Sequence, residues 1–228
     1  MKEFLVNAIK LFLSILIILF LEEYFFKVIA LIGINIEKTN TISLIIYILE
    51  AILIYIIYNS ELKSAFSKYQ NKFANNILYS LISFIVIFMA MIITNYIVKL
   101  IANNLNSTYH GLSFINIFNE EFNFNLLITF IKSIIIIPFI KVCIFVLGIN
   151  NLIKGKSSIV ISGITYALYE GLSIGGSFGA VFIDCIDEFV LFMLLSFIYK
   201  KNSNIAFSIV TFILYELLSG LLLTKVIL

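Results

Sequence analysis

The chain of 228 residues is 62% hydrophobic and only 12% charged, with a formal net charge of +2. A soluble domain of this size needs a mostly polar and charged surface, so the composition excludes an ordinary soluble protein. Every strongly basic residue is a lysine, and without arginine the forked recognition of phosphates and bases is not available. We therefore expect a multi-pass protein of the cell membrane, in contact with the lipid bilayer and without a nucleic-acid partner.

Seven apolar segments approach or exceed the length of about 20 residues that crosses the hydrocarbon core of a bilayer. The first runs from Phe4 to Leu21 and can continue as helix towards Ile34. The others are Ile42–Tyr58, Ile77–Ile101, Leu126–Leu147, Ser158–Leu172, Ala180–Tyr199 and Ile205–Leu223. The sequence thus predicts an all-α fold, a polytopic transmembrane helix bundle of about seven spans in a single integral-membrane domain covering residues 1–228. Six spans result if the shortest segment, Ser158–Leu172, is re-entrant.

The first segment resembles a signal peptide, because a basic start precedes an apolar stretch. No small-residue cleavage site follows it, and the acidic pair Glu22–Glu23 argues against removal, so we interpret it as a membrane helix.

The placement of lysines predicts the orientation, because cytoplasmic loops carry an excess of basic residues. If the seven spans alternate, most loop lysines fall on the side of the amino end. These are Lys2, Lys63, Lys68, Lys72, Lys154, Lys156, Lys200 and Lys201. We therefore expect the amino end in the cytoplasm and the carboxyl end outside.

Carboxylates lie within or beside the apolar segments, namely Glu170, Asp184, Asp187, Glu188 and Glu216. A charge in hydrocarbon costs at least a few kcal/mol, so such residues usually mark a function. The alternative is that they face one another, water or a lysine and only hold the helices in register. Lys141 lies deep in its segment and needs a carboxylate partner or a water cavity. Glu170 or Glu216 can supply the carboxylate, and Tyr166 lies one turn before Glu170 on the same face.

Three stretches have a familiar layout, namely Pro138 to Phe145, Tyr166 to Glu170, and Tyr199 to Ile205 before a last apolar segment. Over about residues 126–228 the chain resembles the CAAX-protease and bacteriocin-processing (CPBP, or Abi) family of intramembrane proteases. That family has Pro-x-x-Glu-Glu-x-x-Phe-Arg on one helix, Phe-x-x-x-His on a later helix, and His-x-x-x-Asn or Asp on the last. The resemblance implies an all-helical bundle in which the glutamate activates a water molecule, while the histidines and the asparagine stabilise an oxyanion.

The chain departs from this pattern at the residues that carry the chemistry. It has Lys141 and Val142 at the glutamate pair, Val146 at the arginine, Glu170 at the first histidine, and Thr211 and Tyr215 near the second histidine and its partner. Lysine and valine do not abstract a proton from water as a glutamate does. The resemblance therefore implies a homologue without the standard proteolytic residues, a pseudoprotease. It would act on or bind a membrane peptide or partner protein, in bacteriocin immunity or envelope regulation.

One string near the amino end matches the family motif out of place. Glu22-Glu23-Tyr24-Phe25-Phe26-Lys27 repeats Glu-Glu-x-x-Phe-Arg with lysine for arginine. Such a string also arises by chance, because acidic pairs followed by aromatic residues are common at membrane boundaries. The functional interpretation is that Glu22 and Glu23 reach Glu170 across the bundle. These three residues would then be the catalytic acids of an intramembrane endopeptidase. Two carboxylates that lie close together differ in proton affinity, so that one acts as the acid and the other as the base.

A function of another class remains open, a small proton- or cation-coupled transporter that uses the intramembrane carboxylates as a relay. The sequence predicts no cofactor and no metal site. His110 is the only histidine and cannot form a zinc site alone, because such a site needs three or four ligands.

Overall fold

The computed structural model describes residues 2–32, 39–104, 124–173 and 178–226. Within these ranges, the side chains of residues 22–32, 39–40, 104, 124–126, 172–173, 178–180, 184 and 220–226 lie outside the description. Every element in the described ranges is helical. The elements are α1 (Lys2–Ile32), α2 (Thr39–Ile57), α3 (Asn59–Gln70), α4 (Phe73–Asn104), α5 (Phe124–Phe130), η2 (Ile131–Ile136), α6 (Ile137–Lys141), η3 (Val142–Gly148), α7 (Ile149–Leu152), α8 (Ser157–Ser173), α9 (Phe178–Asn202) and α10 (Ile205–Val226).

Each of the seven apolar segments forms helix, and the expectation of an all-α fold is confirmed. Within the described residues, three helical stretches are long and apolar enough to cross a membrane, namely Lys2–Leu21, Phe73–Asn103 and Leu127–Leu152. A fourth results if α2 and α3, which meet at 90°, count as one span. The predicted number of about seven is therefore not confirmed by length and composition. The other segments fall short because α8 has 17 residues and α9 carries several acids.

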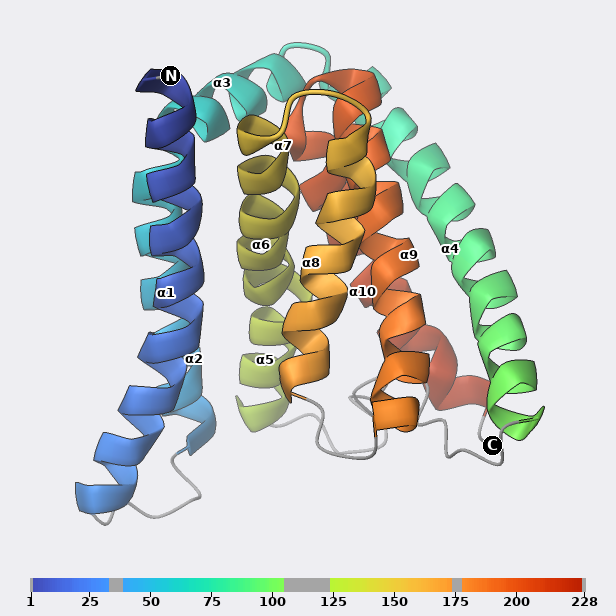
Figure 1. Cartoon of the computed structure of the whole chain (residues 1–228), viewed down its shortest axis with the longest axis horizontal. Coiled ribbons are helices and arrows are strands. Elements are labelled where there is room, and N and C mark those ends of the chain that lie inside the picture. Colours follow the sequence, from blue (N-terminus) through green and yellow to red (C-terminus); the bar gives the residue numbers. More distant parts are fainter. Residues whose placement is uncertain (1, 33–38, 105–123, 174–177, 227–228) are drawn as a thin grey trace.

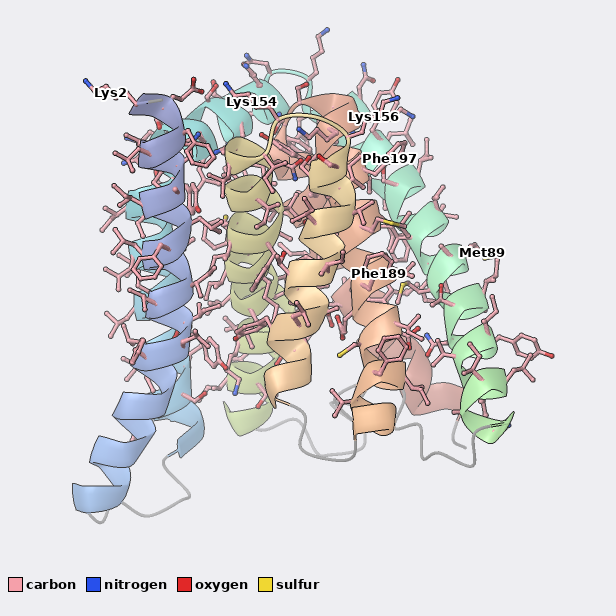
Figure 2. The ribbon with its side chains drawn as sticks, in the orientation of Figure 1. Lys2, Met89, Lys154, Lys156, Phe189 and Phe197 are labelled. Atoms are coloured by element: carbon pink, nitrogen blue, oxygen red, sulfur yellow. The ribbon has the colours of Figure 1, made fainter. Side chains whose placement is uncertain are left out.

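The helices form a bundle with α1 and α2 at one edge and α4 at the opposite edge (Figure 1). The continuous rod from α5 to α7 stands between them, together with α8, α9 and α10. Helix α3 lies across one end of the bundle, and the two chain ends lie at opposite ends of it (Figure 1). Lys2, Lys154 and Lys156 gather at the end that holds the amino terminus (Figure 2). This grouping is the one that the lysine pattern predicts for a cytoplasmic face.

The bundle is apolar outside, and its mostly apolar interior includes small polar side chains. Large apolar side chains stand out from the outer faces, for example Ile82, Met89 and Tyr96 of α4, each more than half exposed. The fully buried positions include small polar residues, namely Ser14, Ser80, Ser158, Ser162, Ser196, Ser208 and Thr211. Apolar surface of this extent and small polar residues at helix contacts are typical of helices in lipid. The protein is a helical membrane protein.

The rod between Phe124 and Leu152 contains two π-helical segments, η2 and η3, separated by the short α6. Such segments are rare, are mostly single turns, and often occur at functional sites. Pro138 begins the first turn of α6, where the missing N–H of its ring is tolerated. All seven residues of η3 are buried, so the wide helix packs on every side. The rod therefore forms the centre of the bundle.

Close contact between helices fixes the rod against α8 and α9. The Asn150 side chain donates to Ser196 Oγ (2.8 Å) and accepts from Ser158 Oγ (2.6 Å), which joins α7, α8 and α9. The hydroxyl of Ser162 donates to the carbonyl of Phe145. Gly163 allows α8 to approach α9, because a Cβ at this position would lie 2.6 Å from the backbone oxygen of Phe189. These contacts hold α8 in the orientation that positions the site.

Candidate intramembrane site

Lys141, at the end of α6, forms the centre of a polar site inside the bundle. Its Nζ donates to Glu170 Oε1 at 2.6 Å and to the hydroxyl of Tyr166 at 2.6 Å. Of the two carboxylates that the sequence offers to Lys141, Glu170 and Glu216, the structure places Glu170 in direct contact with it. Both side chains of the ion pair are partly buried. A bond of this length between charged groups is a strong one in a low dielectric.

Helix α8 supplies both partners of Lys141 because Tyr166 and Glu170 are four residues apart and share a face. The ring of Tyr166 stacks on Phe192 of α9, with ring centroids 3.5 Å apart. Phe145 of η3 meets the edge of the same ring at 5.2 Å. The aromatic side chains thus fix Tyr166, which in turn fixes the lysine.

Two further carboxylates act on the same lysine. Glu188 of α9 and Glu216 of α10 lie close enough for their charges to interact with Lys141, in addition to Glu170. The acids around the site therefore outnumber the ammonium group. Asp187, beside Glu188, is 1% exposed. A cluster with an excess of partly buried carboxylates favours protons or cations, because desolvation penalises each uncompensated negative charge.

A cavity of about 230 Å³ opens beside the ion pair. It is lined by Ile18, Tyr47, Glu50, Ile137, Ile140, Lys141, Tyr169 and Glu170. Glu50 of α2, which is 1% exposed, brings a further carboxylate to this cavity. The sequence analysis did not select Glu50. Its position in the middle of the apolar segment Ile42–Tyr58 is the same signal that selected Glu170.

The structure describes the side chain of only one of the three predicted catalytic acids. Glu170 lies at the cavity, whereas the side chains of Glu22 and Glu23 lie outside the described residues, so their reach to Glu170 stays a prediction. The side chain of Asp184 and all of His110 are outside the description as well. Among the described residues, no three histidine, cysteine or acidic side chains come together in a way that could hold a metal ion.

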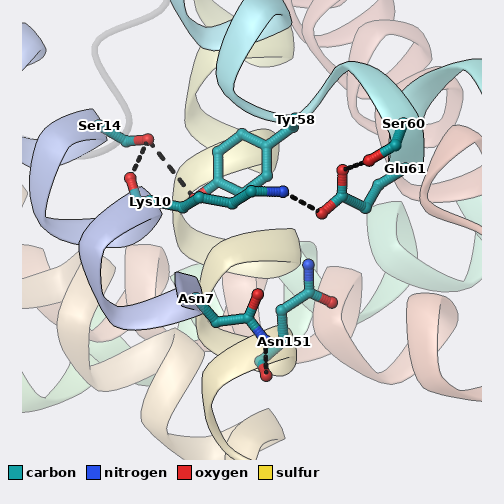
Figure 3. Close-up of polar contacts among 7 residues, drawn as sticks. All are labelled: Asn7, Lys10, Ser14, Tyr58, Ser60, Glu61 and Asn151. Atoms are coloured by element: carbon teal, nitrogen blue, oxygen red, sulfur yellow. Dashed lines mark hydrogen bonds and ion pairs between the residues drawn. The ribbon is translucent and has the colours of Figure 1, made fainter. Parts of the chain in front are cut away.

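A second polar cluster joins α1 to the junction of α2 and α3 (Figure 3). Lys10 Nζ donates to Glu61 Oε1 at 2.5 Å and lies 5.7 Å from the centre of the Tyr58 ring. The hydroxyl of Ser14 lies 3.5 Å from that of Tyr58, and Ser60 donates to Glu61. Helix α3 is mostly polar and lies across one end of the bundle, so this cluster lies at that end.

The pKa of Glu61 yields a testable consequence. Partial burial alone would raise this pKa, but hydrogen bonds from Lys10 and Ser60 hold it below the ordinary value of 4.5. The ionised Glu61 side chain therefore stabilises the folded protein. This stabilisation is fully present above the ordinary pKa of 4.5 and is lost as the pH falls through the lower pKa of the folded state. We expect Glu61→Gln to lower the melting temperature in detergent by about 1–2 °C at neutral pH, which is the effect of losing a partly screened ion pair. The decrease should be smaller at acidic pH.

Glu3→Gln is the matched control for this measurement. Glu3 pairs with Lys154 at 3.3 Å, but both side chains are more than 70% exposed. Its removal should leave the melting temperature unchanged at either pH. An equal effect of the two variants would contradict a special role for the Lys10–Glu61 pair.

The comparisons with known proteins give no family for this chain. No family model matches it, and no curated protein and no solved structure matches it either.

Proposed function

We propose that this chain is a multi-pass protein of the cell membrane with about seven spans and its amino end in the cytoplasm. Its function is that of a CPBP-like homologue without the standard proteolytic groups. It binds a membrane peptide or a partner protein at the cavity beside Lys141 and Glu170. The two chain ends at opposite ends of the bundle support an odd number of crossings (Figure 1).

The contact between Lys141 and Glu170 carries this proposal. The two residues are 29 positions apart in the chain and meet at 2.6 Å. In the resemblance they occupy the positions of the catalytic glutamate and the first histidine, which must meet in a working site. An ammonium that donates to a carboxylate leaves no general base at the glutamate position. The pair therefore supports binding in place of proteolysis.

The size of the cavity supports a protein side chain as its occupant. Its volume of about 230 Å³ lies below the roughly 300–1,000 Å³ of small-molecule sites. One side chain of a partner helix fits this space, and the carboxylates and the lysine offer it charged hydrogen-bond partners.

A photo-reactive amino acid at Tyr169, which lines the cavity, tests the proposal in intact membranes. The neighbouring Leu168 is the matched control because it is 64% exposed on the outer face of the same helix. We expect a discrete protein or peptide adduct at position 169, absent at position 168 and lost when Glu170→Gln is added. The same adducts at both positions would contradict a specific site.

Reporter fusions test the topology. Fusions after Lys72 and Lys156 should report the cytoplasm, and fusions after Ser107 and Leu228 should report the outside. A cytoplasmic report from Ser107 would overturn the proposed arrangement of spans.

The second candidate is a proton- or cation-coupled carrier, which the excess of carboxylates favours. Glu50, Glu170, Glu188 and Glu216 lie around the cavity or act on Lys141. Buried acids of this kind serve as proton relays in transporters. Purified protein in liposomes should then take up protons or cations in response to a gradient, and Glu50→Gln should abolish the uptake. Uptake that is unchanged in the glutamine variant would contradict this candidate.

A further inference from the structure

Helix α2 carries a buried polar column along one face. Ser43, Tyr47, Glu50 and Ile54 follow one another at helical spacing, and Tyr58 follows the last residue of α2 and lies one turn after Ile54. Ser43, Glu50, Ile54 and Tyr58 are at most 6% exposed, and Tyr47 is partly buried and lines the cavity. Four of these five side chains are polar, within a helix that is otherwise mostly apolar. Buried polar groups in a membrane helix need a partner or water, so the column marks a polar part of the bundle interior.

The amino half of the column is continuous. Lys132 of η2 donates to Ser43 Oγ at 3.2 Å, and its Nζ lies 5.6 Å from the centre of the Tyr47 ring. Tyr47 then lines the cavity together with Glu50 and Lys141. Polar groups therefore follow one another from near the amino end of α2 to Glu50.

The carboxyl half of the column belongs to the cluster of Lys10, Ser14, Tyr58 and Glu61 (Figure 3). Glu50 and Tyr58 are eight residues apart, which corresponds to about 12 Å along a helix. The column position between them is Ile54, which is 0% exposed. Ile54 is a member of the main apolar cluster of the bundle. This buried apolar position interrupts the polar column between its two halves.

We propose that the amino half of the column is a proton-access path to Glu50 and that the buried apolar position at Ile54 closes it towards Lys10 and Glu61. This inference rests on the carrier function proposed above. A proton from water in the cavity binds a carboxylate oxygen of Glu50 and returns to the same side. Access from one side at a time is what coupled transport requires, and apolar constrictions block ions by excluding water.

The charged groups that face this path come from several elements. They are Lys132 of η2, Lys141 of α6 and Glu170 of α8, with Glu188 of α9 and Glu216 of α10 acting on Lys141. Protonation of Glu50 therefore responds to the whole cluster and not to α2 alone.

Ile54→Thr tests the barrier, and Ile54→Val is its matched control, because threonine and valine have nearly the same shape. Purified variants in liposomes are given a pH gradient with potassium and valinomycin, and a trapped dye reports its decay. We expect the gradient to decay at the same rate with the valine variant as with the wild type. The threonine variant should dissipate the gradient about tenfold faster, which corresponds to a free-energy barrier to proton passage that is lower by about 1.4 kcal/mol. Adding Glu50→Gln to the threonine variant should remove this acceleration. A leak that persists in the double variant, or equal decay in both single variants, would overturn the proposal.

A second measurement uses the unaltered chain and does not depend on the folding of a variant. An apolar carbodiimide modifies protonated carboxyl groups, and mass spectrometry of the peptides locates the adduct at Glu50, with Glu50→Gln as the blank. We expect the extent of Glu50 modification to depend on the pH of the solution at the side of the membrane where α2 begins, and not on the pH of the other side. Equal dependence on the pH of both sides would overturn the barrier but not proton binding. No dependence on either side would overturn the carrier function itself.

Discussion

Replacing Glu170 by leucine will destabilise the protein by about 2–3 kcal/mol, between the cost for an exposed and for a fully buried pair, because the partly buried Lys141 ammonium loses its nearest carboxylate. Lys141 loses the 2.6 Å bond, although Tyr166 still accepts from it. Glu170→Gln keeps the shape and a hydrogen-bond acceptor, so we expect it to insert and to accumulate as the wild type does. We also expect it to lose the function of the site, because the charge is gone. The measurements are membrane abundance, the melting temperature in detergent and the adduct at position 169.

The double variant Lys141→Met, Glu170→Leu is the control for this prediction. It removes both charges, so its stability should return most of the way to that of the wild type. A double variant as unstable as Glu170→Leu would show that packing, and not the orphaned charge, causes the loss. Full function in Glu170→Gln would end the case for Glu170 as a functional residue.

Gly163→Ala will destabilise the contact between α8 and α9 by about 3 kcal/mol, the upper end of the cost of overpacking. The added Cβ would lie 2.6 Å from the backbone oxygen of Phe189 and 2.8 Å from its ring. A backbone atom within a helix cannot move away cheaply, so the two helices must separate. Because α8 also carries Glu170, we expect the Lys141 site to be disturbed as well.

Gly148→Ala is the matched comparison. There the Cβ would lie 2.6 Å from the hydroxyl of Tyr58 and 2.9 Å from a methyl group of Leu11, which are the ends of flexible side chains. The gain of about 1 kcal/mol in helix propensity offsets part of the crowding. We therefore expect a melting temperature close to that of the wild type. Similar losses in both alanine variants would contradict the distinction between backbone and side-chain obstacles.

Much of the helical layout could be predicted from the sequence because the apolar segments are long and strongly biased. The partner of Lys141 could also be predicted, since a lysine deep in an apolar segment requires a carboxylate and Glu170 was one of two candidates. Helix α3 was read as part of a loop. Its spacing of Leu62, Ala65 and Tyr69, all buried, is a helical pattern that could have identified it.

The remaining features depend on properties that hydropathy does not encode. The count of spans by length fails for α8 and α9, because helices that contact other helices need not be long or uniformly apolar. Glu50 is an exception, because an acid in the middle of an apolar segment is the signal that indicated Glu170 and could have indicated Glu50 as well. The π-helical segments depend on which carbonyl each backbone N–H selects, and side-chain periodicity does not reveal that choice.

The first of these segments, η2, has a consequence for the two lysines of the rod. Lys132 and Lys141 are nine residues apart, which is two and a half turns of a regular α-helix and would place them on opposite faces. Yet Lys132 bonds Ser43 of α2, and Lys141 shares its cavity with Tyr47 and Glu50 of the same helix. A π turn closes its hydrogen bond one residue later, so nine residues complete less rotation. The rotational register of the two cations is therefore set by the backbone hydrogen bonds, and the two ammonium groups reach the same helix because the π segment omits rotation that a regular helix would add.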